Sequence, residues 1–242
     1  MHGSSHPWTP YCGIAPDPAN LPESWNFDPI LIVAILVCLG LGILYAPHKK
    51  SSHLAASGIA LILFVTPLCA LGSALFAMRA VHHVALALVL APLLASSLNL
   101  GQRFGPSSLG LLTGAQAIVF WFWHAPAVYS AALSSSTVFW IMQLSLTGTA
   151  ALWWASMRQA QAPAAVAATL ATMVQMGALG ALLTFARRAF YAPHFATTQA
   201  WGWTPLEDQQ IAGLIMWAPA SAAYLLIALA ILYRSMQPAY AR

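Results

Sequence analysis

The sequence predicts an all-α fold, a polytopic membrane helical bundle with seven transmembrane helices. Hydrophobic residues make up 60% of the 242 residues and charged residues only 6%, and the mean hydropathy is +0.73. A soluble domain of this length needs about 25% charged residues to cover its surface. The apolar residues form long continuous runs, which excludes the short alternating strands of an outer-membrane barrel. The chain is therefore predicted to be an integral membrane protein.

Seven apolar runs are each long enough to cross about 30 Å of hydrocarbon as a helix. In chain order they are residues 29–47, 54–78, 82–100, 108–128, 136–157, 164–186 and 209–233. These runs form one predicted transmembrane domain, residues 29–233. A tail of residues 1–28 precedes it and a tail of residues 234–242 follows it, and we expect no soluble domain and no internal repeat.

The basic residues predict how the bundle is oriented. With seven spans the two tails lie on opposite sides of the membrane, and the larger basic group shares the side of the carboxyl terminus. That group is Lys49, Lys50, Arg103, Arg158, Arg234 and Arg242, against Arg79, Arg187 and Arg188 on the other side. By the positive-inside rule the carboxyl terminus is cytoplasmic and the amino terminus lies outside the cytoplasmic (inner) membrane. No basic run occurs, so we expect no nucleic-acid partner.

The three cysteines do not predict a disulfide framework. Cys38 and Cys69 lie inside apolar runs, where the expected role is that of a small buried hydrophobic side chain. Cys12 lies in the outer tail near His6, where a free thiol would meet an oxidising compartment. A flexible tail with an incidental histidine and cysteine is the alternative.

The stretch FAMRAVHHVALALVLAPLLA, residues 76–95, places Arg79, His82 and His83 against a long apolar run. We expect the second span to end near Met78, and a tight turn at the outer surface to lead to His82. Adjacent residues on a helix point about 100° apart, so the two histidines cannot both face one neighbour. These polar residues either mark the membrane boundary or form a site.

Other side chains of the kinds that bind metals are expected at the same depth. His124 ends the fourth span, His194 lies in the loop after the sixth, and Asp208 lies at the entrance of the seventh. Met216 is eight residues after Asp208, about 12 Å further along a helix. Imidazole and thioether together suit a soft transition metal, copper above all. However, the residues match no fixed-spacing motif such as HExxH or CxxC, so spacing alone does not identify a metal site.

Four segments carry a resemblance to a known family. They are YCGIAPDPANLPESWNFDP, RAVHHVALALVLAPLL, WFWHAPAVYSAAL and TPLEDQQIAGLIMW, which together run from residue 11 to the last helix. The sequence resembles the CtaG family of the caa3 type, seven-span cytochrome c oxidase assembly factors. The resemblance implies a role in maturing a haem-copper oxidase by handling copper for it. The implied partners are oxidase subunits or a copper chaperone.

The resemblance also reaches individual residues. The family pattern is matched by His124, Asp208, Gln209, Gln210, Gly213, Met216 and Trp217. Many members carry two histidines four residues apart at the start of the third span, and these positions are Arg79 and His83 here. A methionine often found one turn later is Ala87. These matches and departures make His83 and His124 the residues that the resemblance best supports as ligands.

We therefore expect an assembly factor that binds Cu(I) transiently near the outer membrane face. The expected copper ligands are His83 and His124, completed by His82, His194 or Met216. The residues expected to support them are Asp208, Arg79 and Gln209, with Asp208 orienting a histidine or pairing with Arg79. An enzyme is not expected, because the sequence shows no nucleophile with a base, no phosphate loop and no paired intramembrane carboxylates.

Other function classes remain open at this point. A membrane transporter of copper or a small solute is disfavoured because the inner halves of the helices carry few polar groups, among them Gln116 and Gln143. A haem-binding protein would use His83 and His124 as axial ligands on facing helices. A purely structural oxidase-binding role needs no metal. The sequence leaves the oligomeric state open, including a homo-oligomer within the lipid bilayer.

Overall fold

The computed structural model describes residues 10–102 and 106–237 of the chain. Across these residues it contains helices and no strand, which agrees with the all-α prediction. His2, His6, Arg103 and Arg242 lie outside the described residues. The predictions that involve these four residues therefore have no structural counterpart.

The helices follow the predicted apolar runs, and several runs contain more than one helix. The α-helices, in chain order, are α1 (Pro29–Tyr45), α2 (Lys50–Phe64), α3 (Pro67–Ala74), α4 (Phe76–Ala85), α5 (Ala91–Ser97), α6 (Leu109–Trp123), α7 (Pro126–Ser134), α8 (Ser136–Met157), α9 (Ala162–Thr184), α10 (Pro205–Trp217) and α11 (Pro219–Met236). A π-helical turn, Leu86–Leu90, joins α4 to α5. Short 3-10 turns lie at Leu21–Glu23, Pro47–Lys49, Leu100–Gln102, Pro106–Ser108, Ala192–His194 and Thr198–Trp201.

Proline explains three of the breaks between consecutive helices. Pro67, Pro126 and Pro219 each begin a helix, a position where the missing N–H is not needed. A proline also disfavours helical geometry at the preceding residue, so the helix before it ends there. The α2–α3 pair is bent by 44° and the α6–α7 pair by 73°. The second bend occurs at His124, which caps the carboxyl end of α6.

Helix length and hydropathy identify three to five candidate membrane spans among the described residues. Three continuous helical segments are long and apolar enough to cross a membrane: Phe76–Ser97, Ala162–Thr184 and Pro205–Met236. The two bent pairs raise the number to five if each pair is one span. α1 is apolar but has only 17 residues. The described residues are therefore those of a membrane protein, while seven spans and the orientation stay predictions.

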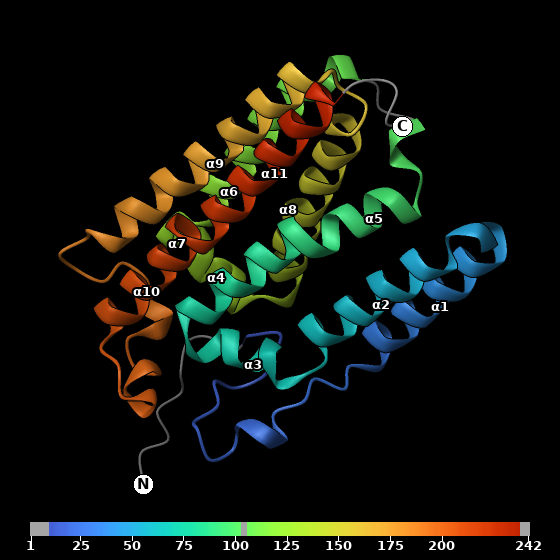
Figure 1. The fold of residues 1–242 in the computed structure, drawn as a ribbon. Coiled ribbons are helices and arrows are strands. Elements are labelled where there is room, and N and C mark those ends of the chain that lie inside the picture. The colour runs from blue at the N-terminus through green and yellow to red at the C-terminus, as the bar shows by residue number, and fades with distance from the viewer. Residues whose placement is uncertain (1–9, 103–105, 238–242) are drawn as a thin grey trace, which may run out of the picture.

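The helices pack lengthwise, and α9 and α11 lie side by side (Figure 1). α4 packs against α10, and α8 packs against both α5 and α6. α9 and α10 approach most closely where Gly180 faces Gly213. A Cβ added to Gly213 would lie 2.5 Å from the Gly180 carbonyl oxygen, so only glycine fits there. Small residues at such crossings let membrane helices pack closely, and this contact fixes α10 next to α9.

The outer surface of the described helices is largely apolar. Exposed large hydrophobic residues lie along α1, α6, α8 and α11, for example Leu36, Leu111, Leu144 and Leu226. A soluble monomer rarely exposes apolar patches of this extent. These surfaces are suited to contact with lipid tails.

The structure corrects the predicted turn before the third span. The break lies at Leu75, whose backbone is extended, and α4 begins at Phe76. Arg79 is therefore inside the first turns of α4 and is fully buried, not exposed in an outer turn. The segment predicted to end the second span is instead the short helix α3, which ends at Ala74.

The prediction for two of the cysteines was also wrong. Cys12 and Cys69 form a disulfide that joins the amino-terminal tail to the first turn of α3. Cys69 was expected inside a continuous apolar helix. The break at Thr66–Pro67 instead places it at the start of a separate short helix, within reach of the tail. Cys38 is a free cysteine exposed on α1.

Candidate functional site

Buried polar residues gather where the first turns of α4, the end of α6 and the start of α10 meet. Arg79, His82 and His83 lie on α4, and His124 follows the last residue of α6. All four side chains are at least 97% buried. Buried polar groups normally have hydrogen-bond partners, so an unpartnered atom in this cluster requires an explanation.

The imidazole of His124 has one partnered and one free nitrogen. Its Nδ1 lies 2.7 Å from the carbonyl oxygen of Phe120, one turn back on α6. A carbonyl can only accept, so Nδ1 carries the proton and Nε2 presents a lone pair. Nε2 is buried and has no hydrogen-bond partner. A histidine whose Nδ1–H binds a backbone carbonyl while Nε2 is free has the arrangement of a metal ligand.

His83 lies next to the ring of His124. The ring centroids of His83 and His124 are 5.3 Å apart, and the two planes are nearly perpendicular. Neither ring nitrogen of His83 has a hydrogen-bond partner. The pair therefore combines two imidazoles from two helices, with three unpartnered nitrogens between them.

His82 points toward a different neighbour. Its ring meets the edge of Phe64 at a centroid distance of 5.0 Å, and it lies 6.2 Å from the ring of His83. Both nitrogens of His82 are also buried without a partner. The 100° separation of adjacent helical residues thus sends His83 toward α6 and His82 toward α2.

Arg79 is a cation without a carboxylate partner among the described residues. Its Nε donates to the Gly72 carbonyl oxygen at 3.2 Å, and its guanidinium lies 5.3 Å from the centre of the Phe139 ring. Nη1 and Nη2 have no hydrogen-bond partner. Gly72 leaves room for this group, because a Cβ there would lie 3.0 Å from the guanidinium carbon. The expected pair between Arg79 and Asp208 does not form.

Asp208 has a different role from the one expected. Its two carboxylate oxygens accept hydrogen bonds from the backbone N–H groups of Phe76, at 2.7 Å, and Ala77, at 3.0 Å. These are the first residues of α4, so Asp208 caps that helix from another part of the chain. Its own helix is capped separately, by a capping box between Thr204 and Glu207. Asp208 therefore positions the helix that carries His82 and His83 and does not contact either imidazole through a hydrogen bond.

The two glutamines after Asp208 hold the loop before α10. Gln209 accepts from the Phe190 N–H at 2.7 Å and donates to the Arg188 carbonyl oxygen at 3.3 Å. Gln210 donates to the Ala186 carbonyl oxygen at 3.3 Å. The DQQ segment thus works as a set of side-chain contacts to backbone groups, which fixes the loop and α4 around α10.

His194 has partners for both ring nitrogens. Its Nδ1 lies 3.2 Å from the Ala74 carbonyl oxygen and its Nε2 lies 2.7 Å from the Tyr129 hydroxyl. Because the carbonyl can only accept, Nδ1 donates and Nε2 accepts from the tyrosine. Burial lowers the pKa of His194 to about 3, which keeps the ring neutral. His194 therefore lacks the free nitrogen that His83 and His124 have.

Met216 lies at the depth of His83, by helix register. Asp208 binds Phe76 and Ala77, so α10 and α4 start at the same level and run side by side. Met216 follows Asp208 by eight residues and His83 follows Phe76 by seven. The Met216 side chain is fully buried. Its thioether is the softest group on α10 at this level.

Three contacts around the site were missed by sequence reasoning. Tyr191 donates to the His124 carbonyl oxygen at 2.7 Å, and Tyr129 supplies the partner of His194. Tyr11, next to the disulfide, stacks on Phe139, whose ring also lies under Arg79. No pattern in the sequence pairs these residues, because each contact joins segments far apart in the chain. Within the described residues no group of three His, Cys, Asp or Glu side chains could by itself hold a metal ion.

The comparisons with known proteins bear on the part of the chain that includes α7 to α11. A family model described as "Cytochrome c oxidase caa3 assembly factor (Caa3_CtaG)" matches residues 112–237, more than half of the chain. No curated protein and no solved structure matches the chain. The matched segment contains His124, the loop that Gln209 and Gln210 hold, and Asp208 with Met216 on α10. The chain belongs to the family of cytochrome c oxidase caa3 assembly factors.

Proposed function

We propose that this assembly factor binds Cu(I) transiently through His83 and His124 and thereby supports the maturation of a haem-copper oxidase. Family membership supports the oxidase assembly role. One observation carries the copper proposal: two neighbouring buried imidazoles, His83 and His124, have unpartnered nitrogens, because the bond from Nδ1 of His124 to Phe120 leaves its Nε2 free. A buried lone pair without a donor costs free energy unless a ligand uses it.

The chemistry of the cluster favours copper as the cargo over a harder ion. Cu(I) accepts neutral imidazole and thioether, whereas magnesium and calcium require several oxygen ligands. The described residues of the cluster offer imidazole nitrogens and, at the same depth, the Met216 thioether. Asp208 is engaged with backbone N–H groups and is not needed as a ligand.

Arg79 gives a reason for the binding to be transient. Its guanidinium is buried on the same helix, one turn from His82 and His83. Like charges repel more strongly at low dielectric than in water, so a cation on the histidines is bound less tightly than it would be without Arg79. A site that must pass its metal to an oxidase or a chaperone benefits from this lower affinity.

The site belongs at the outer face of the cytoplasmic membrane under this proposal. The disulfide between Cys12 and Cys69 joins the tail to α3, at the same end of the molecule as α4, and disulfides persist in oxidising compartments. The described members of the larger basic group lie at the other end of the helices and then face the cytoplasm; they are Lys49, Lys50, Arg158 and Arg234. The three continuous segments, the two bent pairs, α1 and α8 then each cross the membrane once, which gives seven spans.

The test uses His83→Gln, His124→Gln and the double variant, purified at equal membrane abundance. We expect each single variant to lower Cu(I) affinity by at least tenfold, measured by competition with a chromogenic Cu(I) chelator, and the double variant to abolish binding. His82→Gln is expected to be milder. Copper content of the oxidase in the same cells should fall in parallel.

His53→Gln provides the matched control, because His53 is a buried imidazole on α2 outside the cluster. It should bind Cu(I) as the unmodified protein does. Full Cu(I) occupancy and normal oxidase copper in the His83→Gln, His124→Gln double variant would refute the site. A Soret band in the visible spectrum of the purified protein would favour a haem-binding protein instead.

A further inference from the structure

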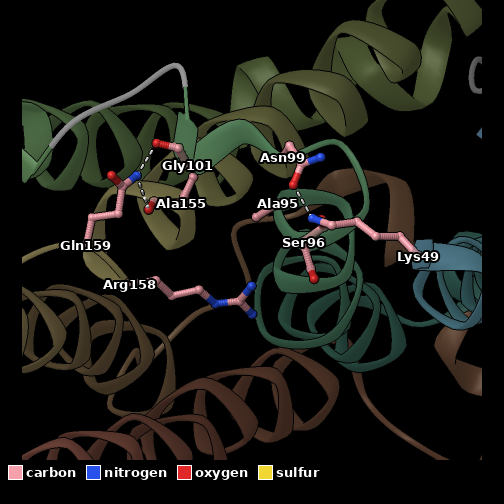
Figure 2. Close-up of a pocket in the computed structure, with 8 residues that line it drawn as sticks. All are labelled: Lys49, Ala95, Ser96, Asn99, Gly101, Ala155, Arg158 and Gln159. Atoms are coloured by element: carbon pink, nitrogen blue, oxygen red, sulfur yellow. Dashed lines mark hydrogen bonds between the residues drawn. The ribbon is translucent and has the colours of Figure 1, made fainter. Parts of the chain in front are cut away.

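A polar groove lies at the end of the helices away from His83 and His124. It has a volume of about 320 Å³ and lies between the start of α2, the end of α5 and the end of α8. Figure 2 shows its lining residues, which are Lys49, Ala95, Ser96, Asn99, Gly101, Ala155, Arg158 and Gln159. Two of them are cations that reach toward α5 from opposite sides of the groove (Figure 2).

Both cations are held by neutral oxygen atoms. The Lys49 ammonium donates to the carbonyl oxygen of Ser96 and to the side-chain oxygen of Asn99. Asn99 has a left-handed backbone, with φ of 53°, which turns the chain after α5 and aims its side chain at Lys49. Arg158 donates from Nη2 to the Pro92 carbonyl oxygen at 3.3 Å. One N–H of Lys49 and most of the five N–H groups of Arg158 are left for another acceptor.

No acidic side chain of the protein can balance these two charges. The five acidic residues of the whole chain are Asp17, Glu23, Asp28, Glu207 and Asp208. Three belong to the amino-terminal tail and two to the first turn of α10, at the other end of the helices. Within the described residues Lys49 and Arg158 therefore meet no carboxylate, and the groove keeps two formal positive charges.

Exposed apolar residues lie close in the chain to the lining residues Asn99 and Lys49, and they indicate what kind of anion would fit. Leu98, between Ser97 and Asn99, is 53% exposed, and Leu44 and Tyr45 at the end of α1 are more exposed still. A free inorganic anion makes no use of such neighbours. An amphiphile would use both, with its anionic group in the groove and its hydrocarbon against these side chains.

We propose that this groove binds the phosphodiester headgroup of an anionic phospholipid. Arg158 and the remaining N–H of Lys49 donate to the non-bridging phosphate oxygens, which are strong acceptors of charge-assisted hydrogen bonds. The acyl chains extend along the exposed apolar surface near Leu98. The site does not depend on copper binding or on the proposed orientation of the bundle.

A purely structural role for the two cations makes a different prediction. Basic side chains near helix carboxyl ends stabilise those ends. The Lys49 ammonium binds a carbonyl in the last turn of α5, and Arg158 follows the last residue of α8. In that role their substitution would change protein stability equally in any lipid. In the proposed role it changes the response to anionic lipid specifically.

The experiment measures binding of phosphatidylglycerol to the purified full-length protein in neutral detergent, by native mass spectrometry and by the lipid-dependent rise in melting temperature. Phosphatidylcholine and inorganic phosphate serve as separate probes. Each basic residue near a membrane surface contributes about 1 kcal/mol, so Lys49→Gln and Arg158→Gln should each weaken phosphatidylglycerol binding about fivefold. Arg158→Lys, which keeps the charge, should retain most of the binding if Arg158→Gln proves unstable.

Lys50→Gln is the matched control, because Lys50 is exposed next to Lys49 and does not line the groove. It should leave phosphatidylglycerol affinity within twofold. Equal loss in Lys50→Gln and Lys49→Gln would overturn the site in favour of general surface charge. Unchanged affinity in the Lys49→Gln, Arg158→Gln double variant, or equal stabilisation by inorganic phosphate or phosphatidylcholine, would also overturn it.

Discussion

Two neighbouring regions of the molecule bury histidines in different ways. In the first, on α4 and α6, His83 and His124 face each other with three unpartnered ring nitrogens. In the second, formed by the loop before α10 and the start of that helix, His194 and Gln209 have their side-chain hydrogen bonds filled by Tyr129 and by backbone groups. We call these the open region and the closed region.

The difference shows that burial alone does not identify a ligand. His82, His83, His124 and His194 are all at least 97% buried, and sequence reasoning treated them together as candidate ligands. Only the hydrogen-bond partners separate a histidine that supports the fold from one with a lone pair to offer. The closed region holds the backbone in place so that the open region can keep its nitrogens free, and such support is typical of metal sites.

The strongest test of this relation changes Asp208, the closed-region residue that caps the helix of the open region. Asp208→Ala removes two charge-assisted hydrogen bonds and leaves two buried N–H groups of α4 without acceptors. We expect a loss of about 3 kcal/mol in the free energy of unfolding. The measurement is denaturant unfolding in detergent micelles.

Asp208→Asn is the matched variant, because its single side-chain oxygen can serve only part of the cap. It should lose roughly half as much stability as Asp208→Ala. Equal stability in all three proteins would show that the cap does not hold α4. Cu(I) affinity of the folded fraction should change less in Asp208→Asn than in His83→Gln.

The second prediction compares one histidine from each region in metal-free protein. His194→Leu removes two hydrogen bonds and leaves the Tyr129 hydroxyl buried without its acceptor, so we expect a loss of about 2 kcal/mol. His83→Leu removes a buried polar group that has no partner, so stability should change by less than about 0.5 kcal/mol or rise. Unfolding of both variants in the same detergent measures the difference. Similar losses in both would mean that His83 has partners in solution and that the open region is not open.

The helices could be predicted from the sequence where an apolar run has no internal proline. α8 has the predicted bounds, 136–157, and α9 starts and ends two residues before its prediction. The run 54–78 failed because hydropathy does not register the break at Thr66–Pro67. Because the short helix α3 and the start of α4 at Phe76 were not predicted, the predicted positions of both Arg79 and Cys69 were wrong.

The site could be predicted only as a set of residue types at one depth. The α-helical repeat correctly indicated that His82 and His83 would face different neighbours. The partner of Asp208 could not be predicted, because 132 residues separate it from Phe76. Every residue except proline has a backbone N–H group, so the sequence carries no signal for which of them a carboxylate binds. The closed state of His194 likewise depends on Tyr129, which lies 65 residues earlier.

The last prediction uses pH to test whether the closed region excludes protons. Burial lowers the pKa of His194 to about 3 from 6.5, so between these pH values the unfolded chain binds a proton that the folded protein does not. This residue therefore destabilises the fold as pH falls below 6.5, by about 1.4 kcal/mol per pH unit, and has no effect above it. His194→Gln removes that contribution, while every other ionisable group is common to both proteins. The gap in unfolding free energy between the unmodified protein and His194→Gln should then narrow from pH 6.5 to pH 5, measured in the same micelles. A gap that stays constant over this range would show that His194 is protonated in the folded protein as readily as in the unfolded chain, and the closed region would then be accessible to solvent.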